Sequence, residues 1–123
     1  MPVQFSNGDL IDKNDKALEA INQAIQALEH ITALPIDLES DRLAELSRAR
    51  NQRTQLGQLN AHLRAAGTVV RPMSEQTANE LNALGNKLDE QIARGEILDA
   101  TVEFVTDVLG DINKLRDIVR AHS

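Results

Sequence analysis

The stretch 97-ILDATVEFVTDVLGDINKLRDIVR-120 decides the fold of this 123-residue chain. Its apolar residues Leu98, Val102, Val105 and Leu109 follow one another at three or four positions, which is the spacing of one face of an α-helix. A strand would instead alternate apolar and polar residues and would be much shorter. The stretch therefore predicts an amphipathic helix over residues 97–120.

Three earlier segments carry the same helical period, and Gly and Pro residues separate them. Their apolar stripes predict helices over residues 10–33, 38–66 and 74–94. Pro35 should end the first helix, because a proline disfavours helical geometry at the residue before it. Gly67 suits the left-handed residue that closes many helices, and it predicts the end of the second.

Four long helices with short connections predict an all-α fold, namely an antiparallel up-down-up-down four-helix bundle. We expect residues 1–8 to form a flexible N-terminal tail and residues 9–123 to form a single helical-bundle domain. Residues 68–72, with valines before an X-Pro bond, predict an extended linker. In such a bundle the second and fourth helices lie on a diagonal, so charged ridges on these two helices should not meet within one chain.

The composition excludes several classes of protein. The chain has no Cys, which excludes a disulfide scaffold, thiol catalysis and a Cys-ligated zinc site. No apolar run approaches the ~20 residues of a membrane span, and the start lacks the pattern of a signal peptide. We therefore expect a cytoplasmic protein that does not bind membranes.

The net charge of −6 is unevenly spread along the sequence. No acidic residue lies between Glu45 and Glu75, while five Arg and no Lys lie there. On a helical wheel the second helix collects an Arg ridge beside its leucine stripe, made of Arg50, Arg53, Gly57, Asn60 and Arg64. The fourth helix carries an acidic ridge at i, i+4 spacing, made of Asp99, Glu103, Asp107 and Asp111.

These ridges allow two interpretations. They can be two solvated helix faces, as runs of charge usually are. Alternatively, the Arg ridge is an interface, because the planar guanidinium binds carboxylates through two hydrogen bonds. Its partner would then be a second copy of the chain, as in a homodimer, or another acidic protein.

Motifs for metal, phosphate and nucleophile chemistry are not found in the sequence. The three His residues lack the Glu-x-x-His spacing of a di-iron bundle, and the Gly residues form no phosphate-binding loop. We therefore expect no metal and no cofactor. Nucleic acid is not an expected partner, because the chain has a pI near 5.0 and no aromatic stacking platform.

The segment 116-RDIVRAH-122 resembles the ribonuclease motif of HEPN domains, which are also helical bundles. The resemblance implies that Arg116 and His122 act on a phosphodiester. It covers seven residues at the end of the predicted fourth helix. As helix C-terminal residues, the same cations also complement the helix dipole.

Taken together, the sequence favours a non-enzymatic helical-bundle module for protein–protein interaction. An adaptor, an assembly chaperone or a subunit of a larger complex would fit this description. Two alternatives stay open, namely an HEPN-like ribonuclease using Arg116 and His122, and a nucleic-acid binder using the Arg-rich second helix.

Overall fold

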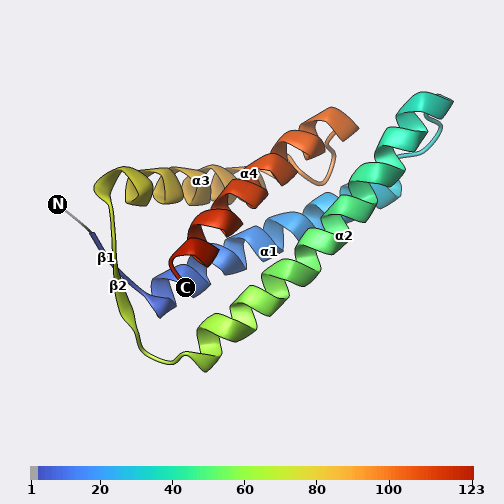
Figure 1. The fold of residues 1–123 in the computed structure, drawn as a ribbon. Coiled ribbons are helices and arrows are strands. Elements are labelled where there is room, and N and C mark those ends of the chain that lie inside the picture. The colour runs from blue at the N-terminus through green and yellow to red at the C-terminus, as the bar shows by residue number, and fades with distance from the viewer. Residues whose placement is uncertain (1–2) are drawn as a thin grey trace.

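The computed structural model describes residues 3–123, most of which lie in four helices, together with a small two-stranded sheet (Figure 1). The predominantly helical fold and the four helices predicted from the sequence are confirmed, whereas the two strands were not expected. Positions 1 and 2 of the expected tail lie outside the described residues. In chain order the elements are β1 (Val3–Ser6), α1 (Asn7–His30), α2 (Ile36–Ala65), β2 (Val70–Met73), α3 (Glu75–Ala93) and α4 (Val102–Ala121).

The first helix, α1, is central and packs against each of the other three helices. Leu10, Ile21 and Leu28 on its buried face are completely shielded from solvent. Small side chains lie between them, so that neighbouring helices can approach the α1 backbone on several sides. These are the alanines Ala17, Ala20, Ala24 and Ala27.

Two buried asparagines of α1 fix its alignment with α2. The side-chain amide of Asn14 donates to the backbone carbonyl of Leu56 at 2.9 Å. The amide of Asn7 donates to the carbonyls of Leu63 at 3.1 Å and Gly67 at 3.0 Å. The pairs 14/56 and 7/63 have the same sum of residue numbers, as expected for two antiparallel helices in one register.

At the other end of this helix pair, Arg42 of α2 continues the same register. Its guanidinium donates to the backbone carbonyl of Leu28 at 2.8 Å, and it also forms hydrogen bonds with the carboxylate of Glu39. The hydrogen bond from Arg42 lowers the pKa of Glu39, and the same bond raises the pKa of Arg42. In this register the last residue of α1 lies level with Ser40, so the first turn of α2 extends beyond α1.

The strands β1 and β2 pair in antiparallel register, with Gln4 opposite Pro72. Phe5 and Met73 point into the core and are both buried. The expectation of a flexible tail over residues 1–8 is therefore corrected, because residues 3–6 form a strand and α1 already begins at Asn7. The extended geometry expected for residues 68–72 agrees with β2.

The helix that the opening stretch predicts begins later than expected. Residues 97–101 precede α4 and include hydrogen-bonded turns, and the Thr101 hydroxyl caps the helix by accepting from the Phe104 N–H at 3.2 Å. Ile97 is nevertheless fully buried, because the turn folds back onto the core. Asp99 therefore lies outside the helix, and the expected acidic ridge is shortened to three residues.

The other helix ends lie close to their predicted positions. α1 ends at His30 rather than at residue 33, because the backbone of Ile31 is already extended with ψ of 126°, and Ala33 then adopts a left-handed conformation with φ of 60°. α2 begins at Ile36, two residues before the prediction, directly after Pro35. Gly67 has the expected left-handed geometry with φ of 74°.

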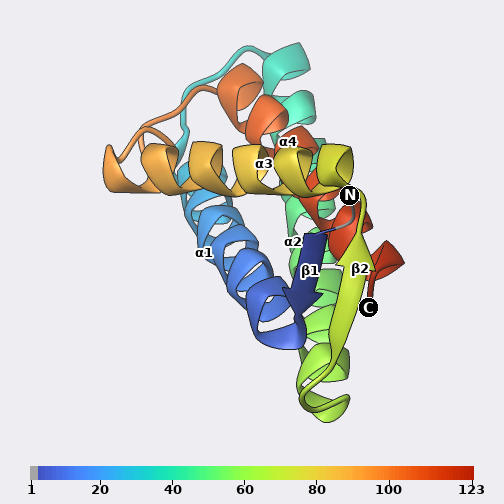
Figure 2. The same ribbon diagram turned by 90° about the vertical axis from the view of Figure 1, so that its left-hand side faces the viewer.

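The arrangement of the helices differs from a regular bundle in which each helix lies alongside the next. Figure 2 shows that α3 lies across α1 and that β2 carries the chain from the end of α2 to the start of α3. α2 and α4, expected on a diagonal, pack against each other. The expected diagonal placement of these two helices is therefore wrong, although the ion pairs of residues 3–123 do not join their charged ridges to each other.

A first test concerns the buried face of α4. Leu109 is fully buried, so Leu109→Asp places an unpaired charge in the core and should remove several kcal/mol of stability, near the total for a small domain. Asp107 lies two residues earlier and is exposed, so Asp107→Asn should change stability by less than about 0.5 kcal/mol. Urea unfolding followed by circular dichroism measures both, and equal losses would contradict the assignment of faces.

A second test concerns the contacts of Arg42 with Leu28 and Glu39 at the start of α2, which we call the Arg42 anchor. Arg42→Met removes the donor to the Leu28 carbonyl and the partner of Glu39, so the urea midpoint should fall clearly. Arg53→Met is the matched control, since Arg53 is exposed and has no ion pair within residues 3–123. If the two variants unfold at the same urea concentration, the anchor contributes nothing.

Candidate functional site

The Arg ridge lies on α2 at the edge that faces α1, and most of its polar members bind α1. Arg50 is 3.4 Å from the Glu29 carboxylate. Arg64 is 3.7 Å from the Asp15 carboxylate, and the Asn60 amide donates to the same carboxylate at 3.0 Å. The positive charge of this acid-free segment is thus largely balanced by acidic residues that are distant in sequence.

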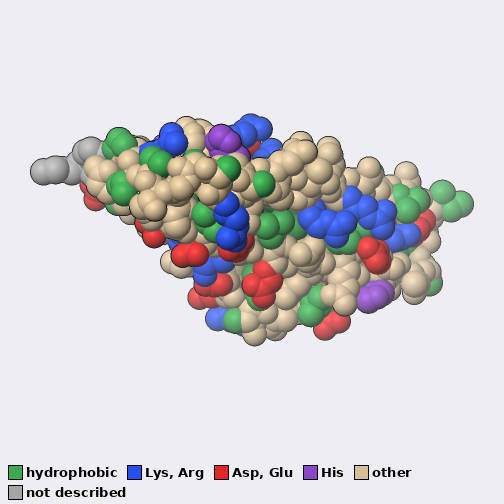
Figure 3. Space-filling view, turned by 90° about the horizontal axis from the view of Figure 1, so that it is seen from below, with side chains coloured by type: hydrophobic (Ala, Val, Ile, Leu, Met, Phe, Trp, Pro, Cys, Tyr) green, Lys and Arg blue, Asp and Glu red, His purple; other side chains and the backbone are tan. Residues whose placement is uncertain are grey.

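Two members of the Arg ridge do not take part in these contacts. Arg53 is exposed and has no ion pair in the described part of the chain, and the space above Gly57 is open. On the face seen in Figure 3, acidic side chains lie next to the cationic ones instead of leaving a continuous basic band. A role for the ridge in binding a partner stays a prediction that now rests mainly on Arg53 and Gly57.

The acidic ridge is divided between two roles. Asp111 is 2.8 Å from the Lys87 ammonium of α3, and its side chain is only 14% exposed, so it joins two helices of the same chain. Glu103 and Asp107 are exposed near the start of α4. These two carboxylates lie beside α2, where they line a groove.

This groove, which we call the end groove, lies between the beginning of α2 and the beginning of α4. It consists of two adjoining hollows of about 400 and 370 Å³ that share Leu38, Val102 and Glu103. Apolar side chains dominate one hollow, and carboxylates surround the other. The full lining is Ile31, Leu34, Leu38, Asp41, Ala44, Glu45, Ala100, Thr101, Val102, Glu103, Thr106 and Asp107.

The beginning of α2 carries large apolar side chains that the chain does not bury. Ile36 is 90% exposed, Leu38 45% and Leu43 52%. The first turn of α2 extends beyond the end of α1, and the buried residues of α2 begin only at Leu46. Figure 3 shows hydrophobic side chains at the corresponding tip of the molecule. Periodicity alone suggests that Leu43 is a core residue, since it continues the leucine stripe.

The residues of the HEPN-like motif have separate environments. Arg116 donates to the side-chain oxygen of Gln55 and is 3.2 Å from Asp117. A hollow of about 450 Å³ beside Arg116 is lined by His62 and Arg120, and His122 is not among its lining residues. The His122 ring nitrogen instead lies 2.8 Å from the Ile118 carbonyl, one turn back along α4.

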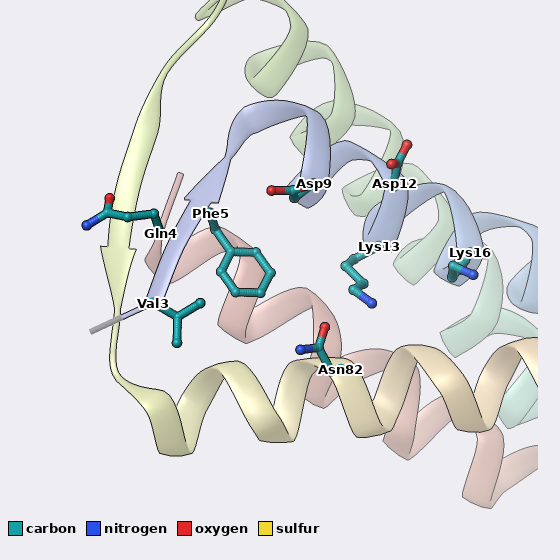
Figure 4. A pocket seen from close by; sticks show the side chains of 8 residues that line it. All are labelled: Val3, Gln4, Phe5, Asp9, Asp12, Lys13, Lys16 and Asn82. Atoms are coloured by element: carbon teal, nitrogen blue, oxygen red, sulfur yellow. The ribbon is translucent and has the colours of Figure 1, made fainter. Parts of the chain in front are cut away.

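Figure 4 shows another hollow, of about 380 Å³, between β1, α1 and α3. Phe5 and Lys13 point toward it, and two of its four charged groups have partners within the chain. Lys16 forms an ion pair with Asp89, and Asp9 accepts a hydrogen bond from the Ser6 N–H at 3.0 Å.

Within residues 3–123, no group of three or more acidic or His side chains is placed to hold a metal ion. Of the helices in the same part of the chain, none combines the length and hydropathy that crossing a bilayer requires. Comparisons with protein-family models, with curated proteins and with solved structures give no match to this chain.

Proposed function

We propose that the chain is a non-enzymatic helical module that binds another protein at the end groove and the adjacent beginning of α2. The observation that carries this proposal is the exposure of the first ten residues of α2. They include Ile36, Leu38 and Leu43, yet none of the ten is buried. Helices in proteins derive most of their stability from packing an apolar face, and within residues 3–123 the large apolar side chains of this segment stay between 45% and 90% exposed.

The energetic incentive for docking is substantial. Covering an exposed Ile or Leu side chain contributes about 1.5–3 kcal/mol through the hydrophobic effect. Covering Leu38 in the hollow, together with the partly exposed Leu34 and Val102 beside it, can therefore supply a few kcal/mol before the costs of association are deducted. An adaptor, an assembly chaperone or a subunit of a larger complex would use such a surface.

The end groove supports docking better than the Arg ridge does. Arg50 and Arg64 already have acidic neighbours on α1, so a partner at the ridge would compete with existing contacts. The same carboxylates disfavour nucleic acid at the ridge, because they would repel phosphate groups. The ribonuclease alternative has less support, since the hollow beside Arg116 is lined by His62 instead of His122.

Site-specific photo-cross-linking tests the proposal. Benzoyl-phenylalanine placed at Leu38 should give a discrete protein adduct in the cells that make this chain, because the side chain lines the groove. Ala61, exposed farther along the same helix, is the matched control position and should give little or none. Combining the Leu38 probe with Val102→Asp, which places a charge on the facing wall of the hollow, should reduce its adduct severalfold. Equal labelling at both positions, or none at Leu38, would reject the groove as a docking site.

A further inference from the structure

We infer that the occupant of the end groove is a basic amphipathic segment of another protein, with apolar side chains on one face and Lys or Arg beside them. This inference rests on the proposed function and specifies the chemistry of the partner. Two features of the end groove carry it, namely its apolar floor and the sign of the charge around that floor.

The floor of the groove is apolar and open to solvent, so covering it with a partner is favourable. Leu34, Leu38 and Val102 line it, and they come from the α1–α2 connection, from α2 and from α4. Ile36 and Leu43 are exposed as well, but they lie roughly 140–160° around the axis of α2 from Leu38 and are not part of the floor. A partner with several Leu or Ile side chains on one face would fill the hollow and cover the neighbouring helix turns.

The charge around this floor is strongly negative. Residues 31–48 and 97–107 hold seven carboxylates and two arginines. Arg42 is already paired with Glu39, and Arg48 lies 3.3 Å from Glu45. The remaining carboxylates on the groove wall, those of Asp41, Glu103 and Asp107, have no ion pair within residues 3–123.

The helix dipole accounts for only one of these three carboxylates. Acidic residues in the first turn of a helix are stabilised by the helix dipole, which explains Asp37 and Glu103. Asp41 and Asp107 are each the sixth residue of their helix, beyond the reach of this effect. Asp107 also follows Glu103 at i, i+4, a spacing at which like charges destabilise a helix. Cations of a partner would relieve this repulsion.

A second copy of the chain is a poor occupant by the same criterion. The chain carries a net charge of −6, so two copies repel each other at most surfaces. Its concentrated positive charge is the Arg ridge, where Arg50 and Arg64 already face carboxylates of α1. A separate basic partner would bring unpaired cations to the groove and would be steered toward it by the negative field.

Titration with synthetic peptides tests the inference. The probe is a fluorescent amphipathic helix of Leu and Lys about five turns long, and its comparison peptides are a Leu–Glu version and a Leu–Lys version scrambled to remove the apolar face. The Leu–Lys helix should bind the full chain at least about tenfold more tightly than either comparison peptide. Raising the salt concentration from about 0.05 to about 0.5 M should weaken its binding severalfold.

Charge-neutralising variants locate the effect. Glu103→Gln with Asp107→Asn should weaken binding of the Leu–Lys helix about tenfold without lowering the urea midpoint. Glu80→Gln with Glu90→Gln removes the same charge from the exposed side of α3, away from the groove, and should change binding less than about twofold. Only an effect specific to the groove supports the inference, since a general loss of negative charge would affect both variants equally.

The outcomes separate this inference from the proposed function. If the Leu–Glu helix binds as well as the Leu–Lys helix, or if both variants lose affinity equally, the basic occupant is rejected. Cross-linking at Leu38 can still succeed in that case, and the groove remains a docking site for a partner of other chemistry. An adduct of twice the chain mass would identify a second copy as the occupant and would also overturn the inference. Failure of both experiments would reject the docking site itself.

Discussion

Three helices pack against α1, and the small side chains along α1 allow them to approach it closely. Ala17, Ala20, Ala24 and Ala27 bring three helices close to one backbone, while Ile21 and Leu28 fill the spaces between them. The chain has only two Phe and no Trp or Tyr, so its core is built from aliphatic side chains that interdigitate at short range. Larger residues at the alanine positions would push the neighbouring helices away from α1.

The alignment of α1 with α2 determines where the end groove lies. Asn14 and Asn7 bind main-chain carbonyls of α2, so they fix how far one helix can slide along the other. With that alignment set, α1 ends four residues too early to cover the first turn of α2. The groove is thus a consequence of where two helices end, and α4 closes its other side because α4 begins at the same end of the molecule.

The sequence predicts the helices well because each helix has its own apolar period. It does not predict β1, because Phe5 is buried only through pairing with a strand more than 60 residues away. It places Leu43 in the core, but Leu43 lies about 60° around the helix from Leu46, away from the buried face, and is half exposed. The partners of Arg50 and Arg64 are also missed, because Glu29 and Asp15 lie on another helix.

The short sheet carries a further consequence through Pro72. Asn7 donates to the Val69 carbonyl at 2.8 Å, so alternation along the ladder makes Gln4 and Pro72 a pair without mutual hydrogen bonds. The nitrogen of Pro72 therefore faces the outer edge of β2, and it has no hydrogen to donate. Exposed strand edges are common starting points for sheet extension and aggregation between molecules. At the middle of this edge an incoming strand would find no donor, so the sheet resists growth on its β2 side.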